Sequence, residues 1–261
     1  YSPNTPLQFD PEIATGQLEN GLTYYVYENE EPEDVAYLRL VIKAGSLQED
    51  DDQQGLAHFV EHMAFNGSTN FAFGEIISFL ESIGMEYGPH LNATTGYDKT
   101  IYKLKIPTDD PAVLEKSMLI LADFAGEVRF EEQAFENERK VIVEEWRESL
   151  GSSKRQGEKL LGIRFANSRY AERKPIGEVE LIKTFDPQRA RDFYYEWYRP
   201  ELMAVIAIGD FEKDNIVSLI KEYFSSLTNP TQGRPREEYR VPLTTEDSIH
   251  FVTDPEETTT I

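Results

Sequence analysis

Residues 55–68 read GLAHFVEHMAFNGS, and His58 and His62 stand four positions apart in this stretch, with Glu61 directly before the second histidine. If the stretch is a helix, each residue advances by about 100°, so the two histidines and the glutamate share one face. An apolar set falls on the opposite side, between about 100° and 200° from His58: Leu56, Phe59, Val60 and Met63. The pattern predicts a helix that is buried along one side and carries a polar group on the other.

That polar group has the spacing of a metal site. Histidines at positions i and i+4 are one helical turn apart, the reach at which two imidazoles can hold one Zn²⁺. Glu61 has the wrong geometry for a third ligand but is suited to take a proton from a metal-activated water. The alternative is a solvated polar face with two chance histidines. Half of the chain's four histidines lie within five residues, opposite an apolar stripe, and this favours the metal site.

A third ligand has to be a carboxylate if it is not a further histidine, because the chain has no cysteine. The segment ENERKVIVEEW (136–146) offers Glu138 and Glu145, which are separated by about two helical turns and therefore project from nearly the same side. One of them can bind the metal while the other hydrogen-bonds to a ligand. Glutamates on helices are mostly solvated, so this assignment depends on the histidine pair.

The composition limits the class of protein. With 261 residues, 39% of them hydrophobic, the chain can bury a sizeable core. Its net charge of −22 argues against nucleic acid as a partner, since phosphates would be repelled. The acidity is explained either by solubility or by a preference for basic substrates. No apolar run approaches the roughly 20 residues of a membrane helix, so no membrane span is expected.

The beginning of the chain gives no targeting signal. The first residues, YSPNTPLQFD, have neither a basic start nor an apolar stretch, so no signal peptide is visible. The chain starts at Tyr1 rather than at methionine, which suggests a processed or trimmed product. The absence of cysteine leaves the compartment open, so a cytoplasmic location also remains an option.

Secondary-structure signals alternate in groups along the chain. Apolar, β-branched or alternating residues predict strands at 21–28 and 35–45, a hairpin at 90–107 and a strand at 202–209. Amphipathic patterns and caps predict helices at 52–65, 73–83, 109–126, 131–150, 153–168, 186–198 and 214–227. This grouping favours an α+β fold in which a largely antiparallel sheet packs against several helices.

The domain organisation is expected to have one boundary. The segment TNPTQGRPREE (228–238), rich in proline, glycine and charge, is the best candidate for a linker. We therefore predict a zinc-binding module at residues 1–230. Residues 231–261 would be a linker and the first strand of a truncated following domain.

Four segments, in the same order, resemble the pitrilysin-type zinc metallopeptidases, the inverzincins, whose H-x-x-E-H reverses the thermolysin-type order. They are GLAHFVEHMAFNGS (55–68), LNATTGYDKTIY (91–102), ENERKVIVEEW (136–146) and FYYEWYRPELMAVIAIGDF (193–211). The resemblance covers about residues 17–227. It is greatest to the catalytic module of long bacterial zinc proteases of exported or periplasmic type, and so implies an exported or periplasmic location.

The resemblance implies specific roles. One zinc ion would be bound by His58, His62 and Glu145. Glu61 would be the general base that activates a zinc-bound water, and Glu138 an assisting acid that hydrogen-bonds to a ligand. The stretch between the histidines and Glu145 is longer than is common in the family, so Glu138 and Glu144 remain alternative ligands.

The resemblance also indicates how substrate would bind. Asn92, Ala93 and Thr94 are similar to a strand edge along which a peptide adds through its main chain; the alternative is that they form an ordinary hairpin. Phe65 falls on the zinc face of the helix and is expected to line the pocket for the residue after the cleaved bond, although a core role fits it equally well.

The expected function is a zinc-dependent endopeptidase that hydrolyses peptides or small unfolded proteins. In the family this module works against a second peptidase-like half that closes a chamber, either in the same chain or in another subunit. The first alternative is a non-catalytic structural or scaffold homologue, which would generally lack part of the motif. The second is a metal-binding module without hydrolytic activity, which chelator-sensitive cleavage of an unstructured peptide would exclude.

Overall fold

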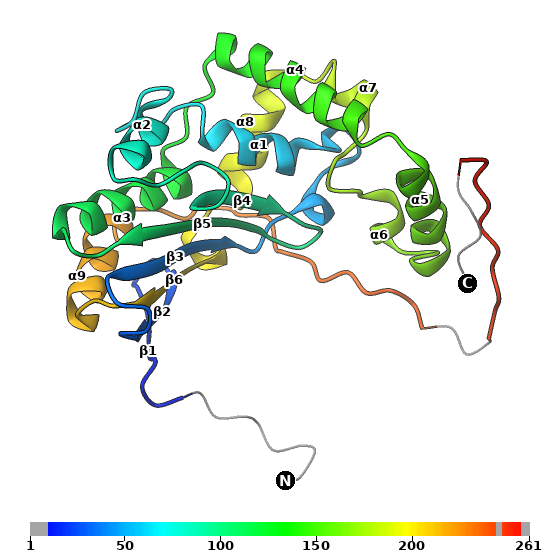
Figure 1. Cartoon of the computed structure of the whole chain (residues 1–261). Helices are drawn as coiled ribbons and strands as arrows, with labels where there is room; N and C mark the ends of the chain where they lie inside the picture. The colour runs from blue at the N-terminus through cyan, green and yellow to red at the C-terminus, as the bar shows by residue number, and fades with distance from the viewer. Residues whose placement is uncertain (1–9, 244–246, 257–261) are drawn as a thin grey trace.

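A six-stranded sheet forms the base of the computed structural model, which describes residues 10–243 and 247–256 (Figure 1). Its strands, in chain order, are β1 (Ala14–Gln17), β2 (Thr23–Glu28), β3 (Val35–Ile42), β4 (Leu91–Thr95), β5 (Thr100–Pro107) and β6 (Met203–Gly209). Their order in the sheet is β1-β2-β6-β3-β5-β4. All neighbours are antiparallel except β2 and β6, which are parallel. The late strand β6 thus lies between β2 and β3, and β4 lies at an edge.

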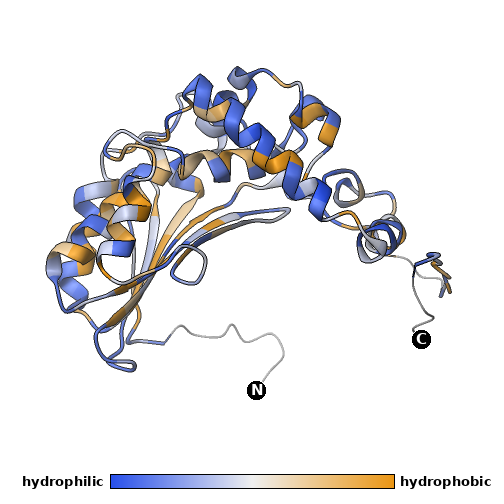
Figure 2. Ribbon diagram, turned by 45° about the horizontal axis from the view of Figure 1, so that its top comes forward, coloured by the Kyte–Doolittle hydropathy of each residue, from blue (hydrophilic) through white to orange (hydrophobic). Residues whose placement is uncertain are grey.

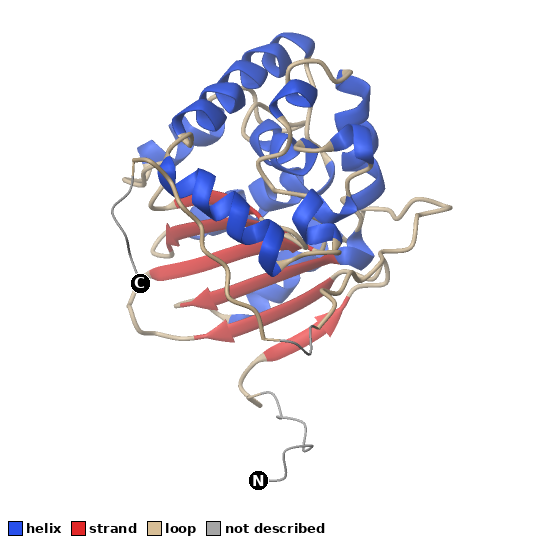
Figure 3. Cartoon of the chain, turned by 90° about the vertical axis from the view of Figure 1, so that its right-hand side faces the viewer, coloured by secondary structure: helices blue, strands red, loops and turns tan. Residues whose placement is uncertain are grey.

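Burial alternates along the central strands, so one face of the sheet is covered and the other is open. On β3 the inward residues Ala36, Leu38, Leu40 and Ile42 are fully buried, whereas Tyr37 and Arg39 between them are exposed. Most of the helices lie together on one side of the sheet (Figure 3), and apolar residues concentrate along the central strands (Figure 2). The period-two pattern of the sequence therefore selects the face on which the helices pack.

The helices are α1 (Leu56–Ala64), α2 (Glu75–Ser82), α3 (Pro111–Gly126), α4 (Glu132–Glu148), α5 (Ser152–Arg164), α6 (Arg169–Glu172), α7 (Val179–Ile182), α8 (Pro187–Trp197) and α9 (Lys213–Phe224). Two of them begin with aspartate followed by proline. The side chain of Asp110 accepts from the Ala112 amide, and that of Asp186 accepts from the Gln188 amide. Each cap satisfies one of the free amides at a helix start, while proline has no amide to satisfy.

The predicted fold class is confirmed, although the elements differ in detail, and the short helices α6 and α7 were not predicted. The short strand β1 was not predicted, because its four residues, ATGQ, carry no run of β-branched residues. The helix expected from Asp52 begins only at Leu56, since Asp51–Gln53 form a 3-10 turn and Gly55 adopts a positive φ of 105°. A positive φ lies outside the right-handed helical region, so the helix cannot extend through Gly55, and glycine is the residue that adopts this φ most easily.

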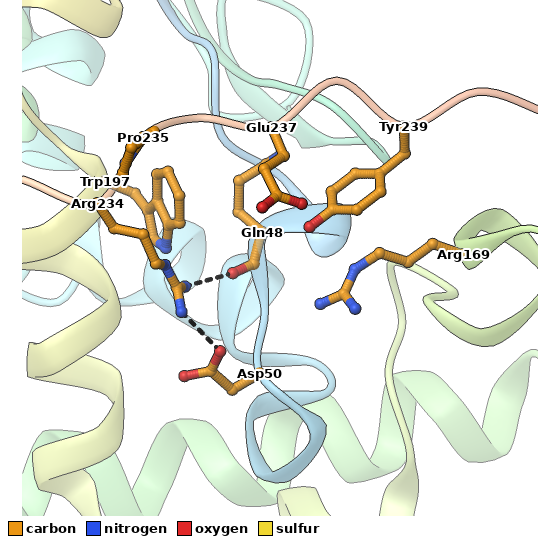
Figure 4. A pocket seen from close by; sticks show the side chains of 8 residues that line it. All are labelled: Gln48, Asp50, Arg169, Trp197, Arg234, Pro235, Glu237 and Tyr239. Carbon is orange, nitrogen blue, oxygen red and sulfur yellow. Dashed lines mark hydrogen bonds and ion pairs between the residues drawn. The ribbon is translucent and has the colours of Figure 1, made fainter.

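The segment after α9 lies along the loop that leads into α1. Arg234 donates to Asp50 and to the carbonyl of Gln48 at the side of a cavity of about 250 Å³, and Arg169 lies under the ring of Tyr239 (Figure 4). Both arginines of this cavity already have partners. We therefore interpret the cavity as part of the contact between the segment after α9 and the loop before α1.

The described residues of 231–261 form neither helix nor strand. Residues 244–246 and 257–261 of this segment lie outside the described residues, so the boundary near 230 and the strand beyond it stay predictions. Within the described part of the chain, none of the helices combines the length and the apolarity that crossing a membrane requires.

Candidate metal centre

Helix α1 is fixed at its start by a buried carboxylate and a pair of glycines. The Glu49 Oε1 atom accepts hydrogen bonds from the amides of Gly55 (3.1 Å) and Ala57 (2.9 Å), so it satisfies two of the free amides at the start of the helix. A Cβ atom on Gly177 would lie 2.3 Å from the Cα of Gly55. The chain must therefore have glycine at position 177 for α1 to begin where it does.

The apolar side of α1 is buried as the sequence pattern predicts. Leu56, Phe59, Val60 and Met63 have no exposed surface. The ring of Phe59 packs on Phe135 of α4 and on Phe185, with centroids 4.4 and 5.2 Å away. This packing leaves the opposite side of α1 facing the polar side of α4.

Three candidate ligand atoms converge between α1 and α4. The Nε2 atoms of His58 and His62 are 3.1 Å apart, and Glu145 Oε2 lies 3.7 and 3.6 Å from them. Two ligands of a tetrahedral zinc ion, each about 2.0–2.1 Å from the metal, are about 3.3 Å apart. The three distances bracket that value, so the residues fit a zinc ion without rearrangement of the helices.

His58 is in the neutral state that a metal ligand requires. Burial, and secondarily the charge of His62, lowers the pKa of His58 to about 3. Its Nδ1 atom is buried and has no hydrogen-bond partner among the described residues. A neutral imidazole has one nitrogen with a lone pair, and Nε2 is the nitrogen that faces the other two ligand atoms.

His62 is oriented by Glu138, the expected hydrogen-bonding partner of a ligand, and by Asn66, which the sequence did not reveal. Its Nδ1 atom lies 2.6 Å from Glu138 Oε1, and Asn66 Nδ2 donates to Glu138 Oε2 (2.8 Å) and to the His62 carbonyl (3.1 Å). Burial lowers the pKa of His62. The hydrogen bond to Glu138 and the charges of Glu138, Glu61 and Glu145 outweigh this effect, so the pKa of His62 is raised from its ordinary value. With Nδ1–H donated to Glu138, the lone pair of His62 is on Nε2.

Glu61 lies on the same face of α1 and is held by the sheet. Its Oε2 atom accepts a hydrogen bond of 2.5 Å from the Thr95 hydroxyl at the end of β4. Burial raises the pKa of Glu61, although the Thr95 hydrogen bond and the charge of His62 oppose that shift. A carboxyl group with a raised pKa beside a metal site is suited to accept and return a proton.

Glu145, rather than Glu144, joins the histidines. Glu144 is directed to Arg147, with an N–O distance of 2.5 Å, and its side chain is 57% exposed. Glu138 contacts the Nδ1 side of His62 and is not one of the three convergent groups. The geometry therefore favours His58, His62 and Glu145 as the ligand set, with Glu138 as the partner of His62.

The strand β4 presents main-chain groups at the edge of the sheet. The Lys105 amide donates to the His90 carbonyl, and the Gly96 amide donates to the Lys99 carbonyl. Because hydrogen-bonded pairs alternate in an antiparallel ladder, the even-numbered residues Asn92 and Thr94 also pair with β5. The amide and carbonyl groups of Ala93 and Thr95 point to the open edge instead.

The side chains of β4 stand out from the two faces of the sheet, whereas the free main-chain groups point to its open edge. Asn92 and Thr94 are exposed, and Asn92 Oδ1 accepts from the Ala93 amide at 2.8 Å. The Ala93 amide is therefore covered by a side chain that a bound peptide strand would have to displace.

A cavity of about 330 Å³ opens beside the candidate ligands. Phe65 lines it and also packs on Tyr102 and Phe124, so the pocket and core roles expected for this residue coexist. Sequence reasoning missed two further aromatic residues of its wall, Phe73 and Tyr87, which are 77% and 56% exposed. Their signal was weak because neither belongs to the histidine motif or to a predicted strand.

Comparison with known proteins gives matches over most of the chain. The family model described as Insulinase (Peptidase family M16) matches residues 24–170, and the model described as Peptidase M16 inactive domain matches residues 184–261. The probable zinc protease PqqL of Haemophilus influenzae is 42% identical over 244 residues, which are 93% of this chain and 26% of that protein. A zinc protease PQQL-like of Arabidopsis thaliana is 40% identical over 83% of this chain and 23% of its own length.

A solved structure is similar over the same region. The crystal structure of the periplasmic protease PqqL from Escherichia coli superimposes with a TM-score of 0.85 at 37% identity, covering 89% of this chain and 26% of that one. The chain thus spans about a quarter of the length of the curated relatives that it matches.

Proposed function

We propose, because the chain belongs to the insulinase (M16) family of peptidases, that it is the zinc-binding part of an endopeptidase that hydrolyses peptides or small unfolded proteins. One observation carries the proposal: two imidazole nitrogens and a carboxylate oxygen converge at the spacing of zinc ligands, with Glu61 on the same helix face. The complete set of polar groups argues against a non-catalytic scaffold.

The proposed ligands are His58, His62 and Glu145. When bound, zinc supplies a Lewis acid that acidifies a coordinated water and polarises a carbonyl group. Held by two histidines and one carboxylate, a zinc ion would keep room for a water molecule, as catalytic zinc sites do.

Glu61 is proposed as the general base. Its carboxylate takes a proton from the attacking water and returns it to the leaving nitrogen, so the same group serves both halves of the reaction. The burial that raises the pKa of Glu61 makes its carboxylate a stronger base for the first of these proton transfers.

Glu138 is proposed to act through His62. Its Oε1 atom accepts the Nδ1 proton, which keeps the Nε2 lone pair directed at the ligand set. Such partners of metal-binding histidines typically contribute about 10- to 100-fold to metal affinity or activity.

Substrate is proposed to bind as an added strand along β4. The Ala93 carbonyl would pair with the peptide, and the Ala93 amide would do so once the Asn92 side chain that accepts from it is displaced, while the side chain of Thr94 would flank the peptide. The residue after the cleaved bond would enter the cavity lined by Phe65, Phe73 and Tyr87, whose aromatic rings favour an apolar side chain.

The full activity is proposed to require a second peptidase-like half that closes a chamber over this site. Glu145 is 48% exposed, so one side of the ligand set is open to solvent in this chain alone. A periplasmic location is proposed by analogy with the relative that is titled a periplasmic protease.

The decisive experiment is the substitution Glu61→Gln in the full-length gene product, with zinc content and cleavage of an unstructured peptide measured together. We expect wild-type zinc content and a fall in kcat of about 10²- to 10⁴-fold, the usual contribution of a positioned general base. Wild-type cleavage by the variant would refute the role of Glu61. Cleavage by the wild type that persists after zinc is removed by a chelator would refute the metallopeptidase proposal.

A further inference from the structure

Thr95 connects the sheet edge to the proposed base. It is the last residue of β4, and its hydroxyl donates to Glu61 Oε2 at 2.5 Å. Its own amide and carbonyl groups point to the open edge of the sheet, next to those of Ala93. One residue therefore touches Glu61 with its side chain and faces the proposed substrate path with its main chain.

The hydroxyl proton of Thr95 has a single use in this arrangement. Thr100 Oγ1 lies 3.4 Å from Thr95 Oγ1, but Thr100 donates its own proton to the carbonyl of Ala44 at 3.0 Å. A hydroxyl has one proton to give, and a carboxylate oxygen can only accept. Because Glu61 Oε2 at 2.5 Å is much closer than Thr100 Oγ1, the proton of Thr95 goes to Glu61. A neutral donor on a buried carboxylate is among the stronger hydrogen bonds of a protein.

We propose that Thr95 is a positioning residue for Glu61. Its hydroxyl occupies Oε2 and fixes the carboxylate, so that Oε1 alone stays free to take the proton from water and to return it. The inference rests on the proposed function, because it assigns Thr95 a role in the reaction that Glu61 performs. Thr95 itself touches neither the metal ligands nor the transferred proton.

The geometry predicts a split between kcat and KM. Substrate would meet residue 95 through its main chain, which a change of side chain leaves in place, whereas the Glu61 hydrogen bond depends on the hydroxyl alone. Loss of the hydroxyl should therefore slow the chemical step and leave substrate binding nearly unchanged.

The test compares Thr95→Val, which keeps the branched shape without the hydroxyl, with Thr95→Ser, which keeps the hydroxyl, in the full-length gene product. We expect Thr95→Val to lower kcat by about 10- to 100-fold, the size of a hydrogen bond to a charged group. KM should stay within about twofold, and Thr95→Ser should recover most of kcat. Thr15→Val makes the same chemical change at an exposed position of β1 and should leave kcat unchanged.

Two further measurements separate positioning from folding and metal binding. Zinc affinity, measured by competition with a chromophoric chelator, should be equal in wild type, Thr95→Val and Thr95→Ser. Crystal structures should show one Glu61 conformer in the wild type and Thr95→Ser, and a displaced carboxylate in Thr95→Val. If Thr95→Val does not fold, Thr95→Ala takes its place in the same comparison with serine.

Three results would overturn the inference: wild-type kcat in Thr95→Val, equal impairment of the serine and valine variants, or loss of zinc from Thr95→Val. If the wild type does not cleave peptides, the proposed function fails. The position of Glu61 in the valine variant still decides the role of Thr95 in that event.

Discussion

Helices α1 and α4 both carry candidate ligands, but they differ in burial. Seven of the nine residues of α1 are buried, whereas only Phe135 and Ile142 are buried among the seventeen residues of α4. The side chains of His58 and His62 are 13% and 22% exposed, and that of Glu145 is 48% exposed. The start of α1 is held by Glu49, while the last turn of α4 ends beside solvent at Ser149.

The difference divides the site into a fixed part and an adjustable part. The histidines are held in place by the packing of α1, so they lose little freedom when an ion binds. Glu145 is free to change rotamer, and fixing such a side chain costs about 1.5–2 kcal/mol. The histidine pair should therefore determine whether zinc binds, and Glu145 should adjust how tightly it is held.

The largest expected effect is on zinc affinity and tests this division directly. We expect His62→Ala to lower the affinity at least about tenfold more than Glu145→Gln does, because the rotamer cost reduces the net contribution of Glu145. His62→Ala also removes the donor to Glu138 Oε1, while Asn66 still donates to Glu138 Oε2. Competition with a chelator of known affinity measures both variants. Equal losses would show that Glu145 is held as firmly as the histidines and would break the comparison.

The second effect concerns the carboxylate that holds α1. Burial raises the pKa of Glu49 to about 8 from 4.5, although amide hydrogen bonds and the charges of Arg173 and Arg169 oppose the shift. The folded chain then binds more protons than the unfolded chain between these values. Stability from this group is complete below pH 4.5 and is lost as the pH rises through about 8.

We expect the unfolding free energy of the zinc-free wild type to decline across that range with a contribution on the order of 1.4 kcal/mol per pH unit from Glu49. Glu49→Gln should remove this contribution and keep the cap on α1, while Glu19→Gln, at an exposed position, should follow the wild type. Urea unfolding at several pH values measures the difference. Parallel curves for Glu49→Gln and the wild type would contradict the prediction.

A smaller effect is expected at Asn66, which lies just beyond α1 and reaches Glu138 of α4. Removing its amide in Asn66→Ala frees Glu138 to rotate away from His62, and zinc affinity should fall by about tenfold, the low end for such partners. Asn137→Ala is the matched control, since Asn137 is next to Glu138 in sequence but accepts from Gln133 instead. If both variants lose affinity equally, the effect comes from α4 as a whole.

The smallest effect is expected at the exposed end of α4. Arg147 pairs with Glu144 one turn earlier, with both side chains more than half exposed. Arg147→Ala should change the unfolding free energy by no more than about 0.5 kcal/mol, as is usual for such helical pairs. Zinc affinity should change by less than about twofold for the same reason. A large loss of affinity would mean that the last turn of α4 fixes Glu145, and the distinction between the two helices would disappear.

The sequence predicted the parts of the molecule that depend on local periodicity. The apolar stripe of residues 55–68 placed α1 in the core, and the alternation within residues 90–107 predicted the hairpin that forms β4 and β5. The α+β fold with a largely antiparallel sheet is confirmed, and so is the resemblance to the pitrilysin-type family. The proposed roles of the site residues stay predictions.

The contacts that complete the site could not be read from the sequence. Thr95 meets Glu61 across a separation of 34 residues, and Asn66 meets Glu138 across 72. A threonine in a strand and an asparagine after a helix are common, so neither has a local pattern that marks it. The carboxylate of Glu49 was missed for the same reason, because its two amide partners are known only once the loop before α1 has folded.

The central position of β6 has a consequence for how the chain is made. Synthesis produces β2 and β3 early, yet the space between them is filled only when residues 203–209 have left the ribosome. Until then β3 can pair on one side with β5, while its other side and the free side of β2 expose unpaired main-chain groups. We therefore expect the nascent chain to need a chaperone at this stage, since unpaired strand edges promote aggregation.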